Sequence, residues 1–166
     1  TAGILLGPDY HYDLARPGIG LYGGAPTPEM AQRMAAIGIR PVLRWEARIL
    51  QVRAAPAGTA VGYGGSWVLE RDSRIATVST GYADGYLRAL SSRAVGMIGD
   101  VAAPLAGRVS MDLLTFDVTD APVDVAVPGA PIELLGPDFG VDAMAAAADT
   151  IAYEVLTRLS GRLRRR

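Results

Sequence analysis

Alternating hydrophobic and polar positions dominate the middle of the chain and predict a series of β-strands. In the longest such stretch, residues 40–53, apolar side chains such as Trp45, Ala47 and Ile49 are separated by charged ones. Successive side chains of a strand point to opposite faces, so this pattern is typical of a strand with one buried face. Shorter runs with strand character lie at residues 67–69, 74–79, 101–109, 113–118 and 132–135, with turn-forming residues between them. Many short strands at this spacing indicate a β-sandwich or a β-barrel.

Helical periodicity is limited to a few stretches. Residues 27–37 predict a short helix with Thr27 as its N-cap, Pro28 at its first position and Gly38 after its end. Residues 141–148 predict a second helix, and a third begins at Thr150. The apolar face of this third helix holds Ile151, Val155, Leu156 and Leu159. Tyr153 points away from that face. The expected fold class is therefore mostly β, with two helices near the C-terminus.

The first part of the chain follows neither period clearly. Its first six residues carry no helix cap and no initiator methionine, so we expect the chain to continue upstream. The glycines of residues 18–23 have the spacing of a dinucleotide-binding fingerprint, but that fingerprint requires an apolar strand before its first glycine. Arg16 and Pro17 stand there instead. We interpret the segment as a glycine-rich connection at the rim of a barrel.

Composition narrows the chemistry that is available. The chain has 166 residues, half of them hydrophobic, which suits one domain with a sizeable core. It contains no cysteine, which excludes a thiolate nucleophile or a sulfur-ligated metal in the chain, and no other metal site is expected. Its net charge of −1 gives no general attraction to nucleic acid or membranes, and we interpret the arginines of residues 162–166 as a solvated tail. Every basic residue except His11 is arginine, so no side-chain amine can form a Schiff base.

The turn at residues 79–86 is the strongest candidate site. A strand pattern ends there, and Gly81 and Gly85 flank Tyr82 and Asp84. A strand end would fix the position of the Tyr82 phenol while the turn exposes its hydroxyl, and this arrangement suits a catalytic side chain. The alternative is a turn tyrosine that covers the core and leaves its hydroxyl in water.

Four short motifs, taken together and in order, resemble one family. They are Arg-Pro-Gly-Ile at residues 16–19, Gly-Tyr-Ala-Asp-Gly-Tyr at residues 81–86, Gly-Arg-Val-Ser-Met-Asp at residues 107–112 and Ile-Ala-Tyr-Glu at residues 151–154. The chain is similar over nearly its whole length to the C-terminal portion of alanine racemases, which are pyridoxal-phosphate enzymes of fold-type III. The resemblance implies that residues 1–24 end the cofactor-binding α/β barrel and that residues 25–166 form the C-terminal β domain. Leu87, where many members have proline, is a small departure.

The resemblance implies a two-base racemisation in which Tyr82 is one catalytic base, acting on the cofactor of the opposite subunit. A free tyrosine has a pKa near 10, so neighbouring cations or donors would have to favour its phenolate. The other base in the family is the Schiff-base lysine of the N-terminal barrel, which this chain lacks. Arg16 matches the residue that faces the pyridine nitrogen, and its guanidinium stays protonated.

The remaining roles implied by the resemblance concern binding. The cofactor phosphate would be held by Gly18, Ile19 and Tyr153, with a further contact from Thr1. The backbone amide of Met111 would receive the carboxylate of alanine, and Arg108 would line the corridor through which substrate arrives. The family is cytoplasmic and homodimeric and supplies D-alanine for peptidoglycan. A racemase of broader amino-acid specificity and a non-catalytic β-domain module for dimerisation or binding are the alternatives.

Overall fold

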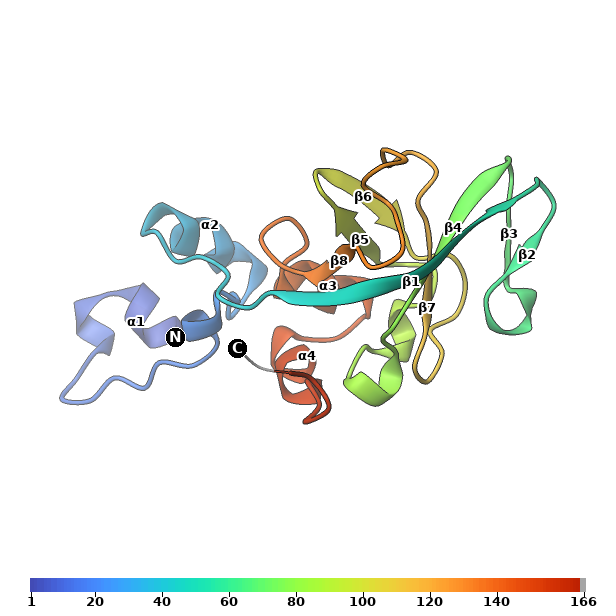
Figure 1. The fold of residues 1–166 in the computed structure, drawn as a ribbon. Helices are drawn as coiled ribbons and strands as arrows, with labels where there is room; N and C mark the ends of the chain where they lie inside the picture. Colours follow the sequence, from blue (N-terminus) through green and yellow to red (C-terminus); the bar gives the residue numbers. More distant parts are fainter. Residues whose placement is uncertain (165–166) are drawn as a thin grey trace.

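The computed structural model describes residues 1–164, in which two short helices precede a β-rich part (Figure 1). The helices are α1 (Ala2–Leu6) and α2 (Pro28–Ala36). The strands are β1 (Trp45–Ala55), β2 (Ala60–Val61), β3 (Trp67–Val68), β4 (Ser73–Val78), β5 (Val95–Ile98), β6 (Val101–Pro104), β7 (Leu114–Asp117) and β8 (Pro131–Leu135). Two helices, α3 (Val141–Ala147) and α4 (Ala152–Arg158), follow the last strand.

Six strands form one antiparallel sheet that is nearly closed into a barrel. Their order is β6-β5-β8-β1-β4-β7, and an isolated bridge between Leu105 and Phe116 links the two ends of the sheet. Leu105 directly follows β6 and Phe116 lies in β7, so the bridge joins the two edge strands. The remaining strands, β2 and β3, pair only with each other and form a small hairpin. The mostly β fold predicted from alternation is confirmed.

Strand β1 is the central element of the sheet, and its burial follows the sequence pattern. Trp45, Ala47 and Ile49 are buried, whereas the residues between them are exposed. The strand pairs with β8 along its first half and with β4 along its second half, with a register shift after Ile49. One strand thus belongs to both halves of the barrel, and the shift allows its direction to change between them.

The core of the barrel is filled by aliphatic and aromatic side chains from every long strand. Its fully buried members include Ile49, Val78, Leu114, Phe116, Ile132 and Leu134. Strand β5 contributes a glycine, because a Cβ atom at Gly96 would lie 2.5 Å from Cδ1 of Ile132 and 3.0 Å from the Phe116 ring. The large side chains of neighbouring strands therefore use the space above this glycine.

The sequence pattern misplaced several elements. Residues 2–6 form helix α1, although no helix was expected there, and the glycine-rich segment at residues 18–23, interpreted as a connection, contains a 3-10 helix at Ile19–Tyr22. The run at residues 101–109 stays a strand only to Pro104, because proline lacks an N–H and Gly107 then takes a φ of +90°. Strand β5 was missed, since Gly96 and Met97 give a weak strand signal.

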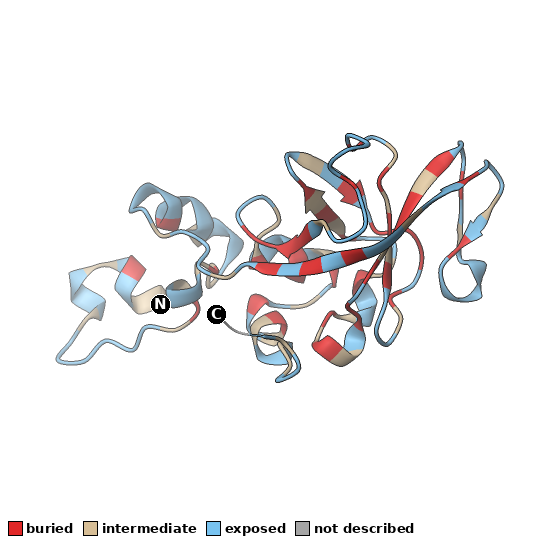
Figure 2. Cartoon of the chain, in the orientation of Figure 1, coloured by how far each residue is buried: buried red, intermediate tan, exposed pale blue. Residues whose placement is uncertain are grey.

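The two N-terminal helices are more exposed than the barrel (Figure 2). Helix α2 confirms the prediction for residues 27–37, with Met34 buried, but Ile37 remains 62% exposed. The connection to the barrel runs through Ile19, which packs into the main core, and through Ala25, whose N–H donates to Asp142 Oδ2 at 2.9 Å. Among the described residues, no helix is both long and apolar enough to cross a bilayer.

Tyr86 is a large, completely buried side chain whose hydroxyl has no hydrogen-bond partner among the described residues. Its ring packs edge-on against Trp45, with 5.7 Å between ring centroids. Burial away from water raises the pKa of this phenol well above its ordinary value. The aromatic contact stabilises the core, whereas burial of the unpaired hydroxyl opposes it.

We predict that Tyr86→Phe raises the free energy of unfolding by up to about 1 kcal/mol near neutral pH, because it removes an unpaired buried polar group. The folded state keeps the Tyr86 proton above pH 10, where the unfolded chain loses it. Stability from this group is therefore complete below about pH 10 and falls above it. Between pH 7 and pH 10.5, the free energy of unfolding in urea should fall less for Tyr86→Phe than for the wild-type protein. The exposed Tyr63→Phe is the control, and equal pH dependence in both variants would contradict the prediction.

Candidate functional site

Residues 79–86, here called the Tyr82 loop, leave the end of strand β4 as a tight turn with a 3-10 segment at Tyr82–Asp84. The Tyr82 side chain is 44% exposed, whereas Asp84 turns inward and is nearly buried. Oδ2 of Asp84 accepts hydrogen bonds from the Gly81 N–H at 3.0 Å and from the Thr80 hydroxyl at 3.2 Å. The inward carboxylate holds the turn together while the phenol faces outward.

Residues 107–112, the Met111 loop, lie directly against the Tyr82 loop. The Tyr82 N–H donates to the Ser110 carbonyl at 3.0 Å, and the Ala83 N–H donates to the Met111 carbonyl at 3.0 Å. Met111 is 54% exposed, and its own N–H makes no hydrogen bond to the residues that the structure describes. The tertiary structure therefore brings together the loop of Tyr82, the predicted base, and the loop of Met111, whose N–H is predicted to donate to the substrate carboxylate.

Two glycines allow this contact. Gly81 has an extended backbone, but a Cβ atom there would lie 2.3 Å from the carbonyl oxygens of Ser110 and Met111. Gly85 has a φ of +105°, and a Cβ atom there would lie 2.1 Å from the carbonyl oxygen of Arg158 in α4. Any side chain at either position would push the Tyr82 loop away from its neighbours.

Arg108 lies at the start of the Met111 loop and is exposed. The next residue is fixed, since the Val109 N–H donates to the Ser91 hydroxyl at 3.0 Å. The guanidinium extends toward the turn that joins β2 and β3, where its Nη1 would lie 3.2 Å from a Cβ atom on Gly64. The small hairpin thus borders the same surface as the two loops.

A second group of predicted residues lies at the front of the chain. Oγ1 of Thr1 accepts hydrogen bonds from the N–H groups of Gly18 and Gly20, both at 3.1 Å. Ile19 is buried between these glycines, whereas the Arg16 side chain is exposed. Two backbone N–H groups therefore converge on the Thr1 hydroxyl oxygen, which occupies the position between them.

Tyr153 lies in the first turn of α4 and is 46% exposed, as its position off the apolar face predicted. Its neighbour Glu154 accepts hydrogen bonds from the Thr150 hydroxyl and from Arg158, the latter at 3.1 Å. These hydrogen bonds lower the pKa of Glu154, so its carboxylate stays charged and holds the start of the helix. Because Tyr153 lies in this helix, the position of its backbone is fixed.

Sequence reasoning missed the role of Arg162. The residue does not belong to a solvated tail, because its guanidinium forms ion pairs with Asp84, at 3.3 Å, and with Asp112, at 2.9 Å. The hydrogen bond to Asp112 and the charge of Asp84 raise the pKa of Arg162. Long separation in sequence hid these contacts, and residues 165–166 of the predicted tail lie outside the described part of the chain.

The two groups of predicted residues lie apart in one copy of the chain. The light-green segment between β4 and β5, which contains the Tyr82 loop, is separated from the N-terminal residues by α4 (Figure 1). One group holds the Tyr82 phenol and the Met111 N–H, which has no partner within residues 1–164, and the other holds two glycine N–H groups that donate to the Thr1 hydroxyl. A single copy does not assemble them into one site.

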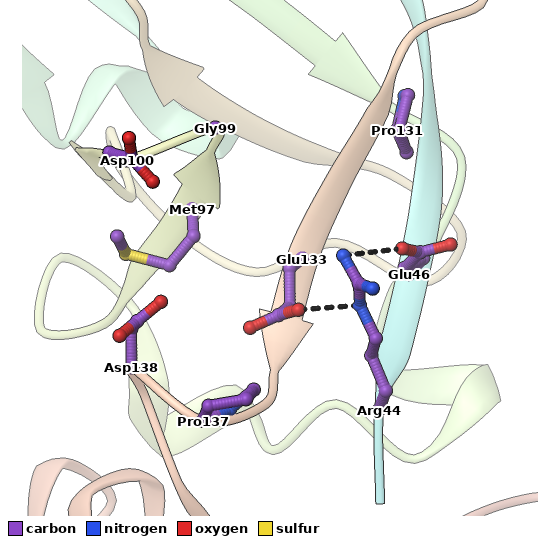
Figure 3. A pocket seen from close by; sticks show the side chains of 9 residues that line it. All are labelled: Arg44, Glu46, Met97, Gly99, Asp100, Pro131, Glu133, Pro137 and Asp138. Carbon is purple, nitrogen blue, oxygen red and sulfur yellow. Dashed lines mark ion pairs between the residues drawn. The ribbon is translucent and has the colours of Figure 1, made fainter.

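A separate cavity of about 340 Å³ lies between β1, β5 and β8 (Figure 3). The Arg44 side chain lines this cavity and forms ion pairs with Glu133 at 2.6 Å and with Glu46 at 3.0 Å. Asp100 and Asp138 also line it, yet none of the residues predicted from sequence does. Within residues 1–164, no group of three or more acidic or histidine side chains is placed to hold a metal ion.

Comparison with known proteins gives consistent matches along the chain. The sequence model of the alanine racemase C-terminal domain matches residues 42–166. The alanine racemase of Rhodospirillum rubrum is 54% identical over 166 residues, and the match covers all of this chain and 43% of that protein.

Solved structures agree with the sequence relatives. The biosynthetic alanine racemase of Pseudomonas aeruginosa superimposes with a TM-score of 0.89 at 42% identity, covering 99% of this chain and 45% of that one. The alanine racemase of Bartonella henselae, a structure with covalently bound pyridoxal phosphate, gives a TM-score of 0.85 at 37% identity and covers 99% of this chain and 44% of that one. The chain thus spans less than half the length of these relatives. It belongs to the alanine racemase C-terminal domain family.

Proposed function

We propose that the chain acts as the C-terminal part of an alanine racemase that interconverts L-alanine and D-alanine. The carrying observation is the contact between the Tyr82 and Met111 loops, which brings the loop with an exposed phenol against the loop with the Met111 N–H, a donor without a partner among the described residues. Family membership and the share of each relative that is matched support the same conclusion. In this proposal residues 1–24 belong to the end of an α/β barrel and residues 25–166 form the β domain.

The front of the chain fits the phosphate of pyridoxal phosphate. The backbone at Gly18 and Ile19 would hold the phosphate oxygens, with the Thr1 hydroxyl, which accepts from the Gly18 N–H, and the Tyr153 phenol as further donors. When bound, this cofactor supplies the electron sink that makes the α-proton of an amino acid removable. Arg16, permanently protonated and exposed, would donate a hydrogen bond to the pyridine nitrogen.

The residues of the Tyr82 and Met111 loops would bind the substrate and transfer its proton. Tyr82 Oη would take up or return the α-proton on one face of alanine, and the Met111 N–H would receive its carboxylate. Arg108 would line the corridor that leads substrate to them, attracting its carboxylate. The rigid end of β4 and the two glycine contacts limit the movement of the phenol.

Two copies are needed in this proposal, because the two groups lie apart in one chain. The Tyr82 and Met111 loops of one subunit would complete the cofactor site of its partner in a homodimer. A barrel lysine would supply the second base, since this chain has none. We place the enzyme in the cytoplasm as a source of D-alanine for peptidoglycan precursors.

Two alternatives differ from this proposal in what they require. A racemase of broader specificity would use the same residues, since the motifs in this chain do not set specificity for the amino-acid side chain. A non-catalytic dimerisation or binding module would leave Tyr82 without a chemical role. Assays of the complete protein with a series of amino acids distinguish an alanine racemase from a racemase of broader specificity. The Tyr82→Phe variant tests whether the chain is a non-catalytic module.

Tyr82→Phe keeps the ring and removes only the hydroxyl. We expect proton abstraction from L-alanine in the complete enzyme to fall by about two to four orders of magnitude, as is typical of a lost general base. Binding of pyridoxal phosphate should persist, as measured by absorbance. Tyr12→Phe, an exposed phenol in the first part of the chain that has no proposed role, serves as the control. Wild-type rates of solvent-deuterium exchange into L-alanine in Tyr82→Phe would refute the assignment.

Met111→Pro removes the backbone donor, whereas Met111→Ala removes only the side chain. We expect Met111→Pro to raise the KM for alanine roughly ten- to 100-fold, because a hydrogen bond to a charged carboxylate is lost. Met111→Ala should change KM little. Steady-state kinetics of both variants test this, and equal effects would show that the side chain binds the substrate.

The chain by itself should neither racemise alanine nor form a covalent adduct with pyridoxal phosphate, because it contains no lysine. Mixing the purified chain with the cofactor, adding borohydride and mapping the peptides by mass spectrometry tests this directly. A reduced pyridoxyl group on an internal residue would contradict the prediction. The complete enzyme, treated in the same way, is the positive control.

A further inference from the structure

The cavity between β1, β5 and β8 has an acidic wall (Figure 3). Four of its lining residues carry a carboxylate and one, Arg44, carries a guanidinium, so negative charge is in excess. The four acidic residues are Glu46, Asp100, Glu133 and Asp138. Its volume of about 340 Å³ lies within the range of pockets that bind small molecules. The cavity therefore has the size and the charge to receive a small organic cation.

Glu133 is the member of this wall that is almost completely buried. Its side chain is 9% exposed, and its two carboxylate oxygens differ in their contacts. Oε2 pairs with Nε of Arg44 at 2.6 Å, whereas Oε1 has no hydrogen-bond partner in residues 1–164. In Figure 3 the unpaired oxygen points away from Arg44, toward the space between Met97 and Asp138. Because burial of an unpaired carboxylate oxygen costs free energy, a donor at this oxygen would stabilise the wall.

The groups next to Glu133 do not supply this donor. A Cβ atom on Gly136 would overlap Oε1 of Glu133, so the glycine leaves room for the carboxylate. The Gly136 N–H itself donates to the Phe139 carbonyl at 3.1 Å. Nη2 of Arg44 pairs with Oε1 of Glu46 at 3.0 Å. A donor to the unpaired oxygen therefore has to enter from the cavity.

The lining favours an alkylammonium group over a metal ion. In the described part of the chain, no set of three or more acidic or histidine side chains is placed to hold a metal. An ammonium carries three N–H donors on a compact charge, so it can serve several carboxylates at once. A planar guanidinium suits both oxygens of one carboxylate, but one oxygen of Glu133 is already paired with Arg44. Met97, Pro131 and Pro137 offer apolar contacts to an attached alkyl chain.

We propose that this cavity binds an alkylammonium group, whose N–H donors reach the unpaired oxygen of Glu133 and the carboxylate of Asp138. The group belongs either to a free amine or to a lysine side chain from another segment of the complete protein or its partner, since this chain has no lysine. The lining includes no residue of the Tyr82 loop or the Met111 loop, all within the described residues. The proposal is therefore independent of the proposed racemase function.

The first test uses butylammonium as the probe and the complete protein with isotope-labelled methionine methyl groups. Met97 lines the cavity, whereas Met30 lies in α2, so NMR shifts of the two methyl groups report binding at the cavity itself. This local readout separates the cavity from any reaction of the amine with pyridoxal phosphate. We expect a saturable shift at Met97 with a Kd of about 1 mM, as for a ligand of few atoms. Butanol, which lacks the charge, should leave both methyl groups unchanged.

Three variants separate the local carboxylates from net charge. Glu133→Gln keeps the size of the side chain and should raise the Kd about ten-fold or more, because a hydrogen bond to a charged group is lost. Asp138→Asn should raise the Kd roughly three-fold, since Asp138 is exposed and its charge is screened by water. Asp124→Asn, at an exposed carboxylate outside the cavity, makes the same change in charge and should leave the Kd unchanged.

The second test asks whether a lysine of the complete protein occupies the cavity. Carbodiimide joins a carboxylate directly to an amine in contact with it, and peptide mapping by mass spectrometry identifies both residues. A link between Asp138 or Glu133 and a lysine would identify a side chain as the occupant, because this chain contributes no lysine. Butylammonium should then fail to shift Met97, since the cavity is already filled.

Each outcome decides the proposal. A saturable shift at Met97 that Glu133→Gln weakens supports a free amine as the ligand, and a lysine link supports an internal side chain. Absence of both overturns the proposal. A shift that Glu133→Gln and Asp138→Asn weaken no more than Asp124→Asn also overturns it, because binding would then reflect net charge alone. Should Glu133→Gln not fold, Asp138→Asn and Asp124→Asn make the same comparison. If the wild-type protein does not racemise alanine, the proposed function fails while the binding experiment still tests the cavity.

Discussion

Close backbone contact at two glycines is the constraint on which the candidate site depends. Gly81 meets the Met111 loop and Gly85 meets the end of α4, and a Cβ atom at either position would overlap a carbonyl oxygen. Because neither glycine has a side chain, the Tyr82 loop can pack against both the Met111 loop and the end of α4. The loops that carry the exposed Tyr82 phenol and the Met111 N–H are neighbours for this reason.

The barrel explains why such a contact can hold a fixed geometry. Strand β4 lies between β1 and β7, so the Tyr82 loop begins from a strand that is paired on both sides. Its inward carboxylate, Asp84, then satisfies the N–H of Gly81, which would otherwise be buried without a partner. Large buried side chains fix the frame, while polar contacts fix the loop on that frame. Positions that carry chemistry can thus remain exposed without becoming mobile.

The separation of the two groups of residues is informative about the protein as an assembly. At the front of the chain, Thr1 Oγ1 accepts from the N–H groups of Gly18 and Gly20, and within residues 1–164 none of these three residues hydrogen-bonds to the Tyr82 loop. A domain that carries part of one site at its front and part of another on its barrel is suited to an oligomer in which subunits complete one another. The proposed racemase has this character, and it accounts for exposed Tyr82 and Met111 side chains on an otherwise well-packed domain.

The class of fold could be predicted from the sequence alone, and resemblance to one family supplied the candidate site residues. Alternation along residues 40–53 and the capping pattern around Thr27 and Pro28 predicted real elements, because side-chain period and helix ends are local properties. Strand β5 and the barrel closure at Leu105 were decided only by tertiary structure, since strand pairing joins residues whose local preference is weak. The same holds for Arg162: its sequence environment is typical of a solvated tail, and only the folded chain brings Asp84 and Asp112 within reach of its guanidinium.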